Sequence, residues 1–126
     1  MRKVIAVDFD GTLCTRNWPK IGEPNTELIR QLAEEQKSGA AVILFTCREG
    51  KLLKEAVKWC REQGLIFDEV NRNLKERIRA YRGDSRKISA DVYVDDRAAA
   101  FSFGQKLRLG GEEDAGEDGQ EGIPED

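Results

Sequence analysis

The sequence predicts an α/β protein in which one Rossmann-like domain holds a parallel sheet between helices. Short runs of β-branched and apolar residues at 4–8, 41–45 and 90–94 are typical of strands buried on both faces. Segments with apolar residues at helical spacing separate these runs. This alternation favours βαβ units with right-handed crossovers.

The first half of the domain is marked by its capping residues. A loop with prolines and glycines follows the strand at 4–8. Asn25 or Thr26 then caps a helix that runs to about Lys37, and Gly39 ends it. The apolar run at 41–45 gives the second strand.

The second half repeats the alternation with weaker signals. A helix is expected from about Gly50 to Gln63, with Gly64 at its end. Further elements are expected in order: a strand at 66–70, a short helix around 74–81, a strand at 90–94 and a helix at 98–107.

Length and composition bound the domain organisation. The chain has 126 residues, of which 39% are hydrophobic, which is enough for one core but not two. We expect a domain at 1–109 and a disordered tail at 110–126, because the tail is rich in Gly, Glu and Asp. No apolar run approaches the ~20 residues that span a bilayer, and the N-terminal run is too short for a signal peptide. A cytoplasmic protein without membrane contact is therefore expected.

The charge and the residue composition limit the kinds of substrate, catalytic group and metal ligand that this chain can have. The net charge is -3, but it is unevenly distributed. Because the tail carries eight acidic residues and no basic ones, residues 1–109 contain 16 acidic and 21 basic residues. This basic body suits an anionic substrate, although it lacks the clustered stripe of a nucleic-acid binder. The absence of histidine excludes Ser-His-Asp and Cys-His catalysis and histidine-bound metals. The three cysteines are expected as reduced thiols.

Polar residues follow the predicted strands at the edge where ligands of parallel sheets bind. Asp8 and Asp10 end the first strand and point the same way, because strand side chains alternate. Thr46 follows the second strand, the Asp95–Asp96 pair ends the last one, and Lys87 lies just before it. Two acidic clusters, a hydroxyl and a cation are therefore expected together.

These residue types suit phosphoryl transfer. Oxygens from Asp8, Asp10 and the Asp95–Asp96 pair can hold Mg²⁺ while water completes its octahedron. Asp8 is the candidate nucleophile and would form an aspartyl-phosphate, with Asp10 as general acid and then base. A hydroxyl from Thr46 and the charge of Lys87 would stabilise the phosphoryl group.

The remaining predicted site residues lie beside these motifs. Gly11 lets the backbone approach closely, so that neighbouring N–H groups can cradle phosphate oxygens. Substrate contacts are expected from Gly11, Thr12, Cys47 and Arg48. Two interpretations are open for Arg48 and Arg97: they contact substrate, or they are surface arginines of the kind that is common at the start of a helix. Trp18 and Lys20, in the loop after the first motif, form a substrate lip or pack against the sheet.

The motifs in order resemble the haloacid dehalogenase (HAD) superfamily of phosphohydrolases. DFDGT at 8–12, LFTCR at 44–48, Lys87 and YVDD at 93–96 match its four motifs. The resemblance implies Asp8 as nucleophile, Asp10 as acid–base, and Mg²⁺ held by the Asp8 side chain, the Asp10 carbonyl and the acidic pair. We favour Asp96 as the direct ligand, with Asp95 direct or through water, and Lys87 over Arg86 as the cation.

Neither interval between motifs is long enough for a full cap domain, so the chain resembles the capless type. Open sites of this type serve bulky substrates or are closed by a neighbouring subunit, so a homo-oligomer is one arrangement to test. The expected substrate is a phosphorylated small molecule or a nucleic-acid end. The alternatives are a non-catalytic module that binds Mg²⁺ and phosphate, and a receiver-like signalling domain, in which the acidic motifs come in a different order.

Overall fold

The computed structural model describes residues 2–84 and 88–95. Its centre is a four-stranded parallel sheet in the order β3-β2-β1-β4, which confirms the predicted fold class. The strands are β1 (Val4–Val7), β2 (Ala41–Leu44), β3 (Glu69–Val70) and β4 (Val92–Val94). All eight residues of β1 and β2 are buried, which explains their continuous apolar sequences.

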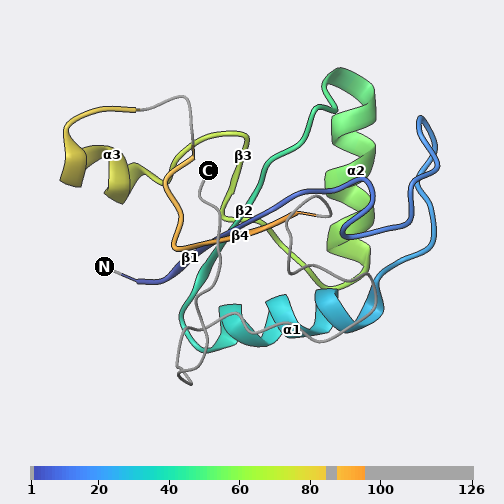
Figure 1. Cartoon of the computed structure of the whole chain (residues 1–126), viewed down its shortest axis with the longest axis horizontal. Helices are drawn as coiled ribbons and strands as arrows, with labels where there is room; N and C mark the ends of the chain where they lie inside the picture. Colours follow the sequence, from blue (N-terminus) through green and yellow to red (C-terminus); the bar gives the residue numbers. More distant parts are fainter. Residues whose placement is uncertain (1, 85–87, 96–126) are drawn as a thin grey trace, which may run out of the picture.

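Helices cover both faces of the sheet (Figure 1). Helices α1 (Thr26–Lys37) and α2 (Gly50–Glu62) pack on one face, where they share a core with alternate residues of β1 and β2. Helix α3 (Lys75–Tyr81) lies on the other face, where Leu74, at its start, packs against Val4, Ala41 and Ile43. The chain moves outward from β1 to β3 with α1 and α2 on one face. It then returns to β4 with α3 on the opposite face, as right-handed crossovers require.

The caps that the sequence marks are present. The Asn25 carboxamide oxygen accepts from the Leu28 N–H at 3.4 Å, and its Nδ2 donates to the Thr12 carbonyl at 3.0 Å. Asn25 therefore starts α1 and also ties the helix to the turn after β1. Gly39 and Gly64 have φ of 108° and 96°, a conformation that favours glycine after a helix.

The two outer strands are shorter than predicted, for the same physical reason. The Asp68 carboxylate accepts from the Val42 N–H, and the Asp91 carboxylate accepts from the Val4 N–H, both at 2.8 Å. At these two positions a side chain satisfies the central-strand N–H, and regular strand begins only at Glu69 and Val92.

Three predicted helices are confirmed closely, and other predictions fall outside the described residues. The helices at 26–37, 50–62 and 75–81 match the expected ranges within a residue. The predicted helix at 98–107 and the tail at 110–126 lie outside the described residues. Within residues 2–84 and 88–95, no helix is both long and apolar enough to cross a membrane.

Candidate functional site

Two of the predicted acidic residues meet at the carboxyl edge of the sheet. Val7 pairs with Val94 in the parallel register of β1 and β4, so Asp8 and Asp95 follow directly on neighbouring strands. The Asp8 N–H donates to the Val94 carbonyl at 3.0 Å, which extends this pairing to the first acid. The strand order reverses at β1, and such a reversal is where parallel α/β sheets bind ligands.

Asp10 is held by a buried arginine. Arg48 Nε donates to Asp10 Oδ2 at 2.9 Å, and Nη2 donates to Oδ1 at 2.8 Å. The Arg48 side chain is 0% exposed, while that of Asp10 is 17% exposed. This two-pronged pairing fixes the plane of the carboxylate as well as its position.

The same guanidinium also holds the loop that follows the first motif. Arg48 Nη1 donates to the Pro19 carbonyl at 3.1 Å, and Nη2 donates to the Lys20 carbonyl at 2.9 Å. The rings of Phe9 and Trp18 lie with their centroids 4.9 and 5.1 Å from its central carbon. Hydrogen bonds to Asp10 raise the pKa of Arg48, against the opposing effect of burial, so it stays charged.

This loop is closed at its base by Thr15 and Glu23. The Thr15 N–H donates to the Glu23 carbonyl at 2.9 Å, and the Glu23 N–H donates to the Thr15 hydroxyl at 2.8 Å. Gly22 packs so closely that an added Cβ would lie 2.3 Å from the Thr15 carbonyl oxygen. Figure 1 shows this blue loop rising beside α2. The exposed residues of the loop include Trp18, at 58%. We therefore define residues 15–23 as the flap loop.

The second motif is positioned by a residue that sequence reasoning missed. Asn71, directly after β3, accepts from the Thr46 N–H at 2.7 Å, and its own N–H donates to the Leu44 carbonyl at 2.7 Å. Asn71 has a φ of 55°, a left-handed conformation that asparagine tolerates better than most residues. The Thr46 hydroxyl accepts from the Arg48 N–H at 3.1 Å. A strand followed by asparagine was the only sequence signal for this role.

The residues predicted to contact substrate differ in accessibility. Gly11 has a φ of 84°, as a close backbone approach requires, but its N–H donates to the Cys14 carbonyl at 2.9 Å. Thr12 is 0% exposed and lies within the turn. Cys47 is exposed, whereas Arg48 is enclosed between Asp10, the flap loop and two aromatic rings. Of these four residues, only Cys47 has an exposed side chain.

The cysteines are free thiols, as predicted. Cys14 and Cys60 are buried in the core below the site, and burial raises the pKa of the Cys60 thiol to about 12. Burial also raises the pKa of Cys14. Both groups therefore remain protonated and act as small apolar side chains.

The described residues of the predicted metal site are oxygen donors. Asp8 and Asp95 follow paired residues at one edge of the sheet, Asp10 comes two residues after Asp8, and carboxylate and carbonyl oxygens are donors whose chemistry fits Mg²⁺. Within residues 2–84 and 88–95, no three acidic, cysteine or histidine side chains are grouped closely enough to hold a metal alone. Asp96, the favoured ligand, lies outside the described residues, as do Lys87, Arg86 and Arg97.

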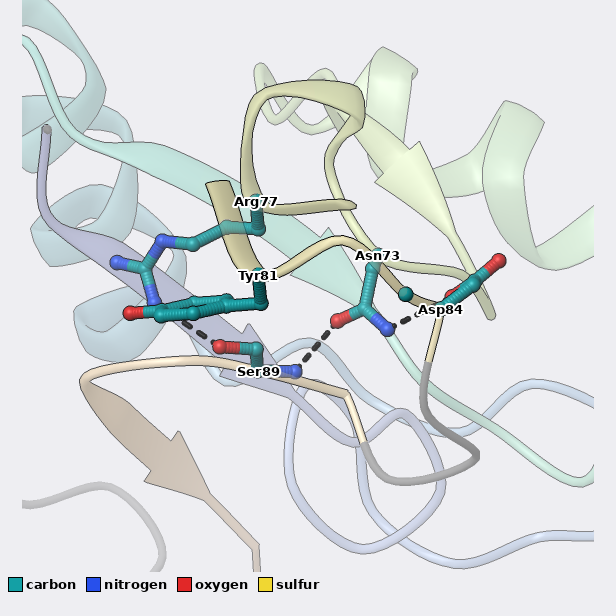
Figure 2. Close-up of a pocket in the computed structure, with 6 residues that line it drawn as sticks. Asn73, Arg77, Tyr81, Asp84 and Ser89 are labelled. Carbon is teal, nitrogen blue, oxygen red and sulfur yellow. Dashed lines mark hydrogen bonds between the residues drawn. The ribbon is translucent and has the colours of Figure 1, made fainter. Parts of the chain in front are cut away.

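A separate hollow lies beside α3. It has a volume of about 430 Å³ and contains none of the predicted site residues; it is lined by Asn73, Arg77, Tyr81, Gly83, Asp84 and Ser89. Figure 2 shows Asn73 between Asp84 and Ser89. Its Nδ2 donates to Asp84 at 2.9 Å and its Oδ1 accepts from the Ser89 N–H at 2.5 Å. Asn73 therefore ties the two ends of the segment that carries Lys87, a role that sequence reasoning also missed.

The chain has a solved relative. No family model matches the sequence, and no curated protein matches it. A conserved protein of Bacteroides thetaiotaomicron has 41% sequence identity and a structure that superposes with a TM-score of 0.68. The match covers 77% of this chain and 78% of the relative. At this identity and coverage, the two proteins are members of one family.

Proposed function

This chain belongs to the same family as the conserved Bacteroides thetaiotaomicron protein, and we propose that it is a magnesium-dependent phosphatase of the HAD superfamily that hydrolyses a phosphate monoester. The main support for this proposal is the placement of the acidic residues at the carboxyl edge of the sheet. Asp8 and Asp95 follow paired positions of adjacent parallel strands where the strand order reverses, with Asp10 and Thr46 at the same edge. The remaining parts of the proposal, Lys87 and Asp96, follow from the sequence motifs.

In the first half-reaction, Asp8 acts as the nucleophile. A carboxylate oxygen of Asp8 forms a bond to phosphorus while the bond from phosphorus to the ester oxygen breaks. The electron pair of that bond stays on the leaving oxygen, which takes a proton from Asp10. The products are an alcohol and an aspartyl-phosphate.

In the second half-reaction, Asp10 acts as a base. It takes a proton from water as the water oxygen attacks phosphorus, and the bond to Asp8 breaks to restore its carboxylate. Thr46 and Lys87 stabilise charge on the phosphoryl oxygens. Bound Mg²⁺ would be held by Asp8, the Asp10 carbonyl and the acidic pair, and it would offset the repulsion between the carboxylates and the phosphate.

The test is phosphate release by the full chain. The substrates are p-nitrophenyl phosphate, nucleotides, sugar phosphates and oligonucleotides with 3′- or 5′-phosphates, each with Mg²⁺ and with EDTA. We expect release that depends on Mg²⁺ and falls by at least about 10³-fold in Asp8→Asn, because the nucleophile is lost. Glu34→Gln, on the exposed face of α1, is the matched control and should behave as wild type.

The outcomes separate the proposal from its alternatives. Full activity in Asp8→Asn would contradict the nucleophilic role. Magnesium binding without release from any substrate would instead favour a non-catalytic module. Preference for phosphorylated oligonucleotides over small esters would identify a nucleic-acid-end phosphatase.

A further inference from the structure

We propose that Arg48 is a positioning residue that sets the acid–base group, Asp10, according to the placement of the flap loop. The proposal rests on the proposed function, since it assigns a role within that reaction. It differs from the sequence-based expectation that Arg48 contacts substrate.

The surroundings of Arg48 leave no side free for a substrate. Its guanidinium makes two hydrogen bonds to Asp10 and one each to the carbonyls of Pro19 and Lys20. The rings of Phe9 and Trp18 pack against it, and the side chain is 0% exposed. A phosphate could reach this cation only if Asp10 or the flap loop first moved away.

The hydrogen bonds join Asp10 and the flap loop into one unit. Two parallel hydrogen bonds fix the orientation of the carboxylate, and each carboxylate oxygen keeps a second lone pair that can carry the proton passed to the leaving group. The other two hydrogen bonds come from the same guanidinium, so a displacement of residues 19–20 is transmitted to Asp10. The ring of Trp18 packs against the guanidinium at this junction and is 58% exposed.

The expected signature depends on the leaving group. p-Nitrophenolate is stable enough to leave without a proton, whereas the alkoxide of an alkyl ester needs one. General acid catalysis typically contributes about 10²–10⁴-fold to such steps. Misplacing Asp10 should therefore slow alkyl esters much more than the aryl ester, while a general loss of structure should slow both equally.

The experiment compares kcat and KM on p-nitrophenyl phosphate with those on glycerol 1-phosphate and adenosine 5′-monophosphate. In Arg48→Met we expect kcat on the alkyl esters to fall by about 10²-fold and kcat on the aryl ester by less than about 10-fold. Arg48→Lys should recover little, because one ammonium cannot replace the planar fork. Trp18→Ala should show a smaller loss with the same bias. Arg30→Met, at an exposed arginine of α1, is the matched control.

Thermal unfolding of each variant accompanies the kinetics. If Arg48→Met does not fold, Trp18→Ala carries the test, because it removes an exposed ring from the junction. Equal losses on aryl and alkyl esters in the folded variants would overturn the inference, as would unchanged kinetics. So would a wild-type protein that cleaves only the aryl ester, since it would have no acid to position. A wild type that releases no phosphate from any ester removes the proposed function itself, and this inference with it.

Discussion

Arg48 and Arg77 are both buried arginines paired with an aspartate, but they lie at opposite edges of the sheet. Arg48 holds Asp10, just beyond the carboxyl end of β1. Arg77, in α3, donates from Nη2 to Asp91 at 2.8 Å and reaches the Arg2 carbonyl at 3.5 Å. These two partners precede β4 and β1, so this arginine serves the amino edge.

The two pairs differ in how completely they are enclosed. Arg48 binds both oxygens of a carboxylate that is 17% exposed, and its other hydrogen bonds go to backbone carbonyls. The side chain of Asp91 is 49% exposed, and Nε of Arg77 has no hydrogen-bond partner within the described chain. Removing one residue of an ion pair lowers the free energy of unfolding strongly where the other residue stays buried. The loss is small where water can replace the removed partner. Loss of Arg48 is therefore expected to lower the free energy of unfolding more than loss of Arg77.

The largest expected effect is at the enclosed pair. Arg48→Met should lower the free energy of unfolding by about 3–5 kcal/mol, because the Asp10 carboxyl group then loses both of its hydrogen bonds to Arg48 and has little access to water. Urea unfolding followed by circular dichroism measures the change. Adding Asp10→Asn should recover part of the loss, because the partly buried carboxyl group that lost its partner is then gone. No recovery would mean that packing against Phe9 and Trp18, not charge, dominates at Arg48.

A smaller effect is expected at the base of the flap loop. Gly22→Ala places a Cβ 2.3 Å from the Thr15 carbonyl oxygen, so the backbone must shift. We expect a loss of about 1–3 kcal/mol in the free energy of unfolding, typical of overpacking. If the loop and Asp10 act as one unit, this variant should also show the alkyl-ester bias proposed for Trp18→Ala. An alanine tolerated with unchanged stability would contradict the close packing at this position.

The smallest effect is expected at the open pair. Arg77→Met should lower the free energy of unfolding by about 1–2 kcal/mol, since two good hydrogen bonds are lost while Asp91 remains in contact with water. The same urea titration measures it beside Arg48→Met. A loss as large as that of Arg48→Met would remove the distinction between enclosed and open pairs. We also expect an equal effect on aryl and alkyl esters, because Arg77 lies at the other edge.

The sequence was most informative where one local rule controls the outcome. Continuous apolar runs predicted β1 and β2, since both faces of a central parallel strand are buried. Asn25 and Thr26 marked the start of α1, because capping depends on a side chain next to the N–H groups that it serves, and the structure assigns the cap to Asn25. The sequence predicted the bounds of the outer strands less accurately. There the Asp68 and Asp91 carboxylates accept hydrogen bonds from N–H groups of the central strands. Such contacts join residues far apart in the chain.

The candidate site divides in the same way. The motif residues at the strand ends could be read from the sequence, because parallel strands bring their carboxyl ends to one edge. Asn71 and Asn73 were missed, because each forms its hydrogen bonds with residues that are distant in the sequence. Arg48 was expected to contact substrate, and only the packing shows it enclosed by Asp10 and the flap loop.

By itself, the sequence determined the parallel α/β class, the ends of the main helices and which residue types follow the strands at the carboxyl edge. These depend on short-range patterns of apolar, capping and strand-end residues. Only the tertiary structure decided that β4 lies beside β1, that Asp8 and Asp95 follow paired residues, and that Arg48 faces inward while Cys47 faces out. Those features depend on strand order and on side-chain burial, which arise when segments far apart in the chain pack together.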